Sequence, residues 1–253
     1  MLSTFPYTGL FMMMAVLVFA HTAETALGFG STVIAMALGI YILPLETLLP
    51  VLVILGILQS LWLMMRWFRH IRWKMLFLKI LPATAIGMVG GIYYRTQVAS
   101  YAQLVILLGV FIMALSIIEI VFIFRTGAIS GRLPWYFGYP ILLAGGMVHG
   151  IFATGGPLIV YYASRELTEQ SEFRASLAVL WLILNIALVF NLVSAGQLTP
   201  HTLAITAFIL PGLIAGIVLG SFLKLKTLAF KIAVYALLFI AALLMLVRHL
   251  SSC

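Results

Sequence analysis

Two polar stretches interrupt this otherwise apolar chain, and each carries side chains that could bind an anion or a proton. The first runs from His21 to Ser31 and contains Glu24, and the second runs from His149 to Pro157. Each stretch is rich in glycine and lies between two apolar runs. A glycine- or proline-interrupted apolar segment that recurs in both halves of a membrane protein indicates the binding site of a secondary transporter.

The glycine-rich part of each stretch predicts the start of a half-helix. A helix start presents free N–H groups and a partial positive charge, so it can bind an anion without a nearby cation. Glycine also lets the backbone approach a ligand closely, and proline suits the first turn of a helix. We expect an oxyanion to bind at mid-membrane between the two breaks, with tight helix packing alone as the alternative. The expected binding residues in the breaks are Gly28, Gly30, Ser31, Thr32, Thr154, Gly155, Gly156 and Pro157.

Three titratable side chains in the breaks could gate the site or carry protons. Glu24 lies far from either end of its apolar segment, where an ionisable group is costly and is functional by default. A structural carboxylic acid, hydrogen-bonded to a nearby threonine, is the alternative. His21 and His149 can titrate near neutral pH, although a buried histidine that only donates a structural hydrogen bond fits the pattern equally well. The expected proton-coupling residues are therefore Glu24, His21 and His149.

The two halves of the chain repeat their features in the same order. We predict two membrane repeats, residues 1–125 and 126–253, within one integral-membrane domain. Matched glycines four residues apart would let a neighbouring helix approach closely. Matched amides, Gln59 and Asn185, are expected either to donate N–H groups to the oxyanion or to bridge helices. The aligned pairs are Gly30 with Gly156, Gln59 with Asn185, Gly87 with Gly216, and Gly91 with Gly220.

The composition places the chain in a membrane. It is 64% hydrophobic and 8% charged, with a mean hydropathy of +1.23, whereas soluble domains carry about 25% charged residues. About 20 apolar residues span a bilayer, and the sequence predicts an all-α, multi-pass protein of the inner cell membrane. Its apolar segments are residues 8–43, 45–65, 75–94, 99–124, 135–163, 173–195, 202–223 and 227–247.

The distribution of positive charge predicts how these segments cross the membrane. If each crosses once, the loop lysines and arginines divide almost evenly between the two sides, which conflicts with the positive-inside rule. If 8–43 and 135–163 are instead hairpins broken at their glycines, only Arg95 and Arg248 lie on the side opposite the others. The hairpin scheme predicts an outside N-terminus and two halves of inverted orientation, with single kinked crossings as the alternative. It makes Arg69, Arg132, Arg165 and Lys226 cytoplasmic.

The remaining features narrow the class of function. The basic residues, which give a net charge of +8, sit beside apolar segments and do not predict nucleic-acid binding. The single cysteine, Cys253, offers no thiolate cluster, and we expect no cofactor and no metal. We predict that the protein is a transporter and not an enzyme. Its expected partners are a small anionic substrate and the lipid bilayer, and a homo-oligomer is left open. The alternatives are a haem or metal electron carrier that uses His21 and His149, and a non-transporting membrane scaffold.

A series of short motifs runs through the second half of the chain, namely Gly145-Gly146, Gly150, Thr154-Gly155-Gly156-Pro157-Leu158, Phe173-Arg174-Ala175, Asn185 and Gly196-Gln197-Leu198-Thr199. These motifs resemble those of the sulfite exporter TauE/SafE family. The first half shows the same layout in Gly28-Phe29-Gly30 and in Pro82, Gly87 and Gly91, so the likeness covers nearly the whole chain. It implies a small multi-span permease that exports sulfite, sulfoacetate or a related sulfur anion. The Gly-Phe-Gly-Ser of the first break departs from the consecutive glycines usual in that family.

Overall fold

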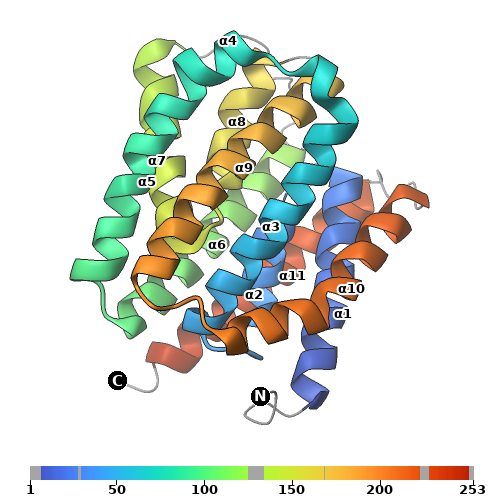
Figure 1. Cartoon of the computed structure of the whole chain (residues 1–253), viewed down its shortest axis with the longest axis vertical. Coiled ribbons are helices and arrows are strands. Elements are labelled where there is room, and N and C mark those ends of the chain that lie inside the picture. Colours follow the sequence, from blue (N-terminus) through green and yellow to red (C-terminus); the bar gives the residue numbers. More distant parts are fainter. Residues whose placement is uncertain (1–6, 28–29, 125–133, 168, 223–227, 251–253) are drawn as a thin grey trace. The chain divides into compact units, whose positions relative to one another are not determined.

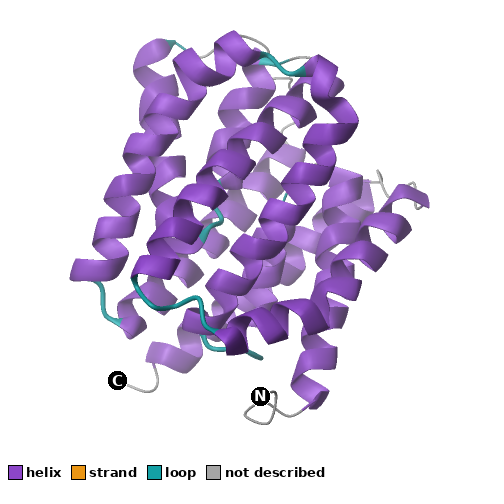
Figure 2. Ribbon diagram, in the orientation of Figure 1, coloured by secondary structure: helices purple, strands orange, loops and turns teal. Residues whose placement is uncertain are grey.

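A computed structural model of the chain describes residues 7–27, 30–124, 134–167, 169–222 and 228–250. These residues form helices joined by short turns, and none of them forms a strand (Figure 2). Six of the described helical segments, each of 19 to 26 residues, are long and apolar enough to cross a membrane. The prediction of an all-α membrane protein is therefore confirmed. The main helices are α1 (Tyr7–Leu27), α2 (Ser31–Gly39), α3 (Leu45–Trp67), α5 (Leu81–Tyr93), α6 (Tyr101–Phe124), α7 (Trp135–Phe152), α8 (Gly156–Glu166), α9 (Gln170–Ser194), α10 (Pro200–Phe222) and α11 (Leu228–Leu250) (Figure 1).

Short helical pieces extend α5 at both ends. The chain enters through a 3₁₀ turn, η1 (Phe68–His70), and the short α4 (Trp73–Met75). Two π-helical turns, η2 (Leu76–Ile80) and η3 (Tyr94–Val98), precede and follow α5. α4, η2, α5 and η3 together make one continuous apolar span from Trp73 to Val98, whereas η1 ends the preceding span, Leu45–His70.

The chain separates into two compact units. Unit 1 contains residues 1–48, 98–129 and 207–253, and unit 2 contains residues 49–97 and 130–206. Each unit therefore draws on both halves of the sequence. The sequence repeats 1–125 and 126–253 stay a prediction.

Unit 2 is built around a close, parallel pair of helices, α5 and α7, which lie side by side in Figure 1. A Cβ atom on Gly87 or Gly91 would overlap backbone carbonyl oxygens of α7. Equally, a Cβ on Gly146 or Gly150 would overlap carbonyl oxygens of α5. Each helix thus presents two glycines, four residues apart, to the backbone of the other, which is the small-residue packing typical of membrane helices.

Unit 1 contains a similar close pair, α10 and α1, in which the contacting glycines lie on α10. A Cβ on Gly216 would lie 2.7 Å from the Cβ of His21, and one on Gly212 would lie 2.7 Å from the carbonyl oxygen of Met14. Gly220 meets Thr25 one turn further along both helices. The predicted close approach at the matched glycine pairs is confirmed in both units. In each case the partner is the broken segment of the other half of the sequence.

Both broken segments are helical hairpins. In unit 1, Gly39 of α2 faces Met13 of α1, whereas residues nearer the break, Ser31 and Glu24, face each other. In unit 2, a Cβ on Gly145 would lie 2.7 Å from Ile159, and one on Gly138 would lie 2.6 Å from Tyr162. Because the paired residue number falls as the other rises, each second helix runs back along the first. The breaks expected from the sequence are therefore reversals of the chain.

Contacts at the ends of each unit favour the hairpin scheme over single crossings. In unit 2, the Nε of Arg72 lies 2.9 Å from a carboxylate oxygen of Glu172, and the Nζ of Lys79 lies 3.8 Å from that of Glu166. In unit 1, Tyr41 and Tyr101 line a cavity of about 450 Å³ together with Arg248. Single crossings would separate the members of each group across the membrane. Which end faces the cytoplasm stays a prediction, and Arg132 and Lys226 lie outside the described residues.

Candidate functional site

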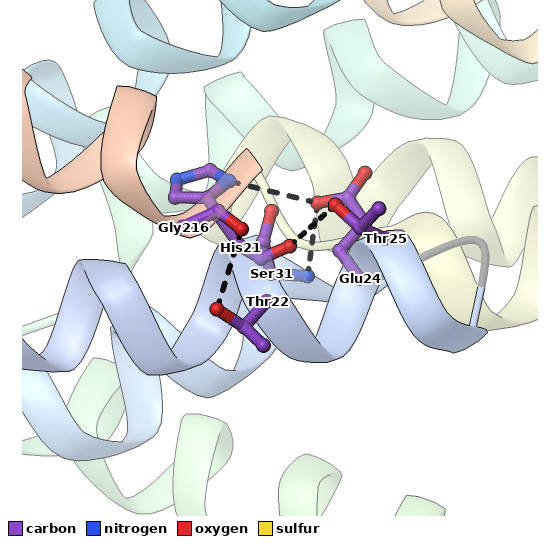
Figure 3. Close-up of polar contacts among 6 residues, drawn as sticks. All are labelled: His21, Thr22, Glu24, Thr25, Ser31 and Gly216. Atoms are coloured by element: carbon purple, nitrogen blue, oxygen red, sulfur yellow. Dashed lines mark hydrogen bonds and ion pairs between the residues drawn. The ribbon is translucent and has the colours of Figure 1, made fainter. Parts of the chain in front are cut away.

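The first break is stabilised by a carboxylate that belongs to the chain itself. Glu24, in the last two turns of α1, accepts a hydrogen bond of 3.3 Å from the backbone N–H of Ser31, the first residue of α2 (Figure 3). The same carboxylate oxygen lies 4.0 Å from the Nδ1 of the buried His21, one turn earlier. A carboxylate at a helix start is favourable because it meets both free N–H groups and the positive end of the helix dipole. Glu24 therefore takes the position that an external anion would otherwise take.

Hydroxyl groups near Glu24 bond to backbone carbonyls. Thr22 donates a hydrogen bond of 3.3 Å to the carbonyl oxygen of Gly216 on α10, and Thr25 donates one of 2.8 Å to that of His21 (Figure 3). The first of these bonds joins α1 to α10 at the glycine contact, where the backbones are close enough for a threonine to reach. It fixes the last turns of α1, from which Glu24 projects.

Gly30, the residue immediately before α2, has a positive φ angle of 103°. This conformation strains any residue with a Cβ atom. Ser31 is buried and Thr32 is half-buried at the start of α2. Gly28 lies outside the described residues, so its predicted role in binding stays a prediction.

The second break is formed by a strained residue, Ala153, and by a close contact at Gly155 that excludes a side chain. Ala153 ends α7 in the left-handed conformation, with φ 56°, and its N–H donates a hydrogen bond of 2.7 Å to the carbonyl oxygen of His149. A Cβ on Gly155 would overlap the carbonyl oxygen of Gly145, which belongs to α7. Gly156 then begins α8, and Pro157 occupies its first turn as predicted. No acidic residue lies in the first turn of α8.

Buried polar side chains gather beside the start of α8. Thr154 is only 2% exposed, and its hydroxyl has no hydrogen-bond partner among the described residues. His149, also 2% exposed, stacks on Trp181 of α9 with ring centroids 5.4 Å apart. Neither ring nitrogen of His149 makes a hydrogen bond of normal geometry to any residue that the structure describes, although the Asn185 side chain lies beside the ring. Trp181 also covers Gly156, whose Cβ position is 3.9 Å from the indole.

The two predicted amides lie on neighbouring helices of unit 2. A Cβ on Gly56 of α3 would lie 2.8 Å from the Nδ2 of Asn185 of α9. Gln59 is one turn further along α3, and both amide side chains are buried. Gly56 therefore provides the space in which Asn185 lies between α3 and His149.

The structure thus groups the predicted residues into two clusters, one in each compact unit. We call the cluster of His21, Glu24, Gly30, Ser31 and Thr32 the first-break cluster. The second-break cluster contains His149, Thr154, Gly155, Gly156, Pro157 and Asn185, and we include Gln59 because it lies one turn from Gly56, which packs on Asn185. The sequence analysis did not single out Trp181, although its spacing of four residues from Asn185 puts both on one helix face.

The chemistry available in the clusters is the binding of anions and the transfer of protons. Among the described residues no group of three or more histidine, cysteine or acidic side chains is arranged to hold a metal ion. The second-break cluster offers hydroxyl, amide and backbone donors with no carboxylate among its members. The first-break cluster adds a carboxylate and a histidine in contact range.

Comparison with known proteins agrees with this reading of the two breaks. The sequence profile described as sulfite exporter TauE/SafE matches residues 13–246. The chain is also 30% identical over 156 residues to the probable inner membrane transporter protein TsaS of Comamonas testosteroni. That match covers 61% of this chain and 63% of the relative, so the chain spans less than two thirds of the relative's length. No solved structure matches the chain significantly. The chain belongs to the sulfite exporter TauE/SafE family, a family of membrane transporters and not of enzymes, as its sequence predicted.

Proposed function

We propose that this protein is an inner-membrane permease for a small oxyanion, either sulfite or an organosulfonate, and that the anion binds at the second-break cluster. The observation that carries this proposal is the hydroxyl of Thr154. It is buried, lies immediately before α8, and has no partner within the described part of the chain. Leaving a buried hydroxyl unsatisfied costs about 1–3 kcal/mol, so a ligand that accepts its hydrogen bond would recover that free energy.

The groups around Thr154 fit an oxyanion. The start of α8 supplies backbone N–H groups and the positive end of a helix dipole, which together bind anions. Asn185 and Gln59 can add amide donors, and Trp181 closes the site on the side of Gly156. The absence of an acidic residue from the first turn of α8 removes the repulsion that an anion would otherwise meet.

The first-break cluster has a different role in the proposal. The carboxylate of Glu24 already accepts the N–H of Ser31, so the protein itself satisfies one of the free N–H groups at the start of α2. Glu24 could exchange a proton with the transport path, and His21 is the titratable side chain within 4.0 Å of it. We assign proton coupling to Glu24 and His21, and substrate binding to the second break.

Family membership favours transport over the two alternatives, an electron carrier or a scaffold. The relative's name describes it as an inner membrane transporter, which is why we place this chain in the same membrane. The family description and the anion chemistry of the cluster support a sulfur oxyanion as the proposed substrate.

The test is a Thr154→Val variant, which keeps the shape of the side chain and removes its hydroxyl. We expect sulfite or sulfonate affinity, measured by calorimetry in detergent, to fall about tenfold, as for the loss of one hydrogen bond. Without anion the variant should be at least as stable as the wild type, because no hydrogen bond is lost.

Thr84→Val is the matched control in the same unit. Thr84 is fully buried, and its hydroxyl already donates to the carbonyl oxygen of Ile80 at 2.9 Å. This variant should lose stability and keep its anion affinity. Unchanged anion affinity in Thr154→Val would contradict the proposed site.

A further inference from the structure

An arginine at one end of unit 2 carries donors that the described protein does not use. Arg95 lies in η3, the π-helical turn that follows α5, close to the end of the Trp73–Val98 span. Its Nη2 donates a hydrogen bond of 2.7 Å to the Oδ1 of Asn191 on α9. This bond holds the guanidinium in one orientation against α9.

The other side of the same guanidinium is buried and unsatisfied. The Nε and Nη1 atoms of Arg95 are shielded from solvent and have no hydrogen-bond partner among the described residues. The ion pairs found within the described ranges involve His21, Arg72 and Lys79, so no carboxylate there pairs with Arg95. A buried charge without a partner is strongly destabilising.

The usual structural roles of an arginine do not account for this geometry. An arginine that only anchors a helix at the membrane surface extends its head group into water, whereas two of the three nitrogens of Arg95 are out of reach of water. An arginine that only joins two helices would satisfy its donors with carbonyl or carboxylate oxygens. Within the described part of the chain, Arg95 makes one such bond, to Asn191, and its Nε and Nη1 stay shielded from solvent without a partner.

The position of Arg95 alongside α9 shows at which end of unit 2 it lies. Arg72 and Glu172 are paired at the start of α9, and Asn191 lies near its end. At 1.5 Å per residue, these two ends of α9 are about 28 Å apart, which approaches the thickness of a bilayer core. Arg95 is therefore at the membrane face opposite to Arg72, which is the face predicted to be outside.

We propose that Arg95, oriented by Asn191, binds a small oxyanion at this end of unit 2, separately from the second break. Planar guanidinium groups bind two oxygens of a sulfite, sulfonate or phosphate group, and Arg is preferred over Lys for that geometry. That the anion is the transported one rests on the proposed function. The site would then receive or release the substrate on the outer face.

The test compares Arg95→Gln and Arg95→Lys with Arg69→Gln in the full-length protein. Arg69 is an exposed arginine of the same unit, so its variant removes the same charge without touching the site. Titration calorimetry with sodium sulfite in lipid-free detergent should detect two binding events in the wild type. Arg95→Gln should weaken one event roughly 10- to 100-fold, the effect of losing hydrogen bonds from a charged donor. The sulfite affinity of Arg95→Lys should lie between those of the wild type and Arg95→Gln, and that of Arg69→Gln should equal the wild-type value.

A second measurement separates binding from a structural role. Without anion, Arg95→Gln should melt at the same temperature as the wild type or higher, because an unpaired buried charge is removed. A lower melting temperature combined with unchanged sulfite binding would overturn the proposal and leave Arg95 as a structural link to Asn191.

The remaining outcomes identify the anion and separate this inference from the proposed function. If native mass spectrometry shows an anionic phospholipid lost only from the Arg95 variants, the site is confirmed with a lipid phosphate as its ligand. If Thr154→Val loses a sulfite event and Arg95→Gln keeps both, the proposed function stands and the Arg95 site is rejected. If only Arg95→Gln loses an event, the Arg95 site stands and the second break is rejected. No sulfite binding and no bound lipid in the wild type would reject both.

Discussion

The two helical hairpins of this protein share a backbone plan and differ in how the start of the second helix is satisfied. In the first, Glu24 reaches back from α1 and accepts the N–H of Ser31. In the second, no acidic residue lies in the first turn of α8, and the Thr154 hydroxyl beside it has no partner among the described residues. A break whose donors are used by the protein is suited to coupling, and one whose donors are unused is suited to binding a ligand.

The glycines of the two breaks are also required for different reasons. Gly30 is required by its backbone conformation, because its φ angle is 103°. Space is not the reason, since a Cβ there would meet nothing within 4 Å. Gly155 is required by space, since a Cβ there would overlap the carbonyl oxygen of Gly145. The first break therefore depends on a local conformation, and the second on the close approach of α8 to α7.

The largest expected effect is that of Gly155→Ala. Because the overlapped atom belongs to the backbone of α7, relief requires the hairpin to separate, and we expect a loss of roughly 3 kcal/mol or more, above the usual range for single substitutions. Gly156→Ala is the matched control, since its Cβ would meet only Trp181 at 3.9 Å. Thermal unfolding in detergent measures both. Equal stability of the two variants would show that α8 does not depend on this contact.

The next largest effect concerns the amides of the second-break cluster. Asn185→Leu or Gln59→Leu should weaken oxyanion binding by roughly 1–3 kcal/mol, the range for a lost buried hydrogen bond, with little loss of folded protein. Calorimetry with sulfite measures the change in affinity. Unchanged affinity in both variants would mean that the amides only join α3 to α9.

Gly30→Ala should have a smaller effect than Gly155→Ala. With a φ of 103° and no steric contact, the cost is that of the left-handed conformation, roughly 1–2 kcal/mol. The thermal unfolding midpoint should fall accordingly, while anion affinity stays close to that of the wild type. A collapse in anion affinity with intact stability would transfer the binding site to the first break.

The smallest effect, and the one of opposite sign, is expected for Ala153→Gly. Ala153 adopts the left-handed conformation that glycine adopts without strain, and relief of that strain is partly offset by the greater freedom of glycine in the unfolded chain. We expect a gain of about 0.5 kcal/mol, from strain of 1–2 kcal/mol less the entropy term. A destabilised variant would show that the Ala153 methyl group packs in a way that outweighs the strain.

Sequence reasoning could locate the breaks and the close helix contacts because both are local signals. The glycines and Pro157 mark the helix starts, and glycines four residues apart, such as Gly87 and Gly91, mark a close approach. The partners of those glycines could not be predicted, because no local pattern says that α5 packs on α7 instead of a helix of its own half. Arg95 was counted only as a loop charge, since burial of its guanidinium depends on Asn191, 96 residues away.

The most direct test of the division between the two hairpins is flux in proteoliposomes across an imposed pH gradient, with Glu24→Gln and Thr154→Val measured side by side. Glutamine keeps the shape of Glu24 and a hydrogen-bond acceptor for Ser31, but it cannot exchange a proton. We predict that Glu24→Gln transports the anion without the pH dependence of the wild type. Thr154→Val should transport less at every pH and keep the wild-type pH profile. A Glu24→Gln variant whose flux still responds to the pH gradient like that of the wild type would contradict the account. A Thr154→Val variant with undiminished flux would contradict it as well.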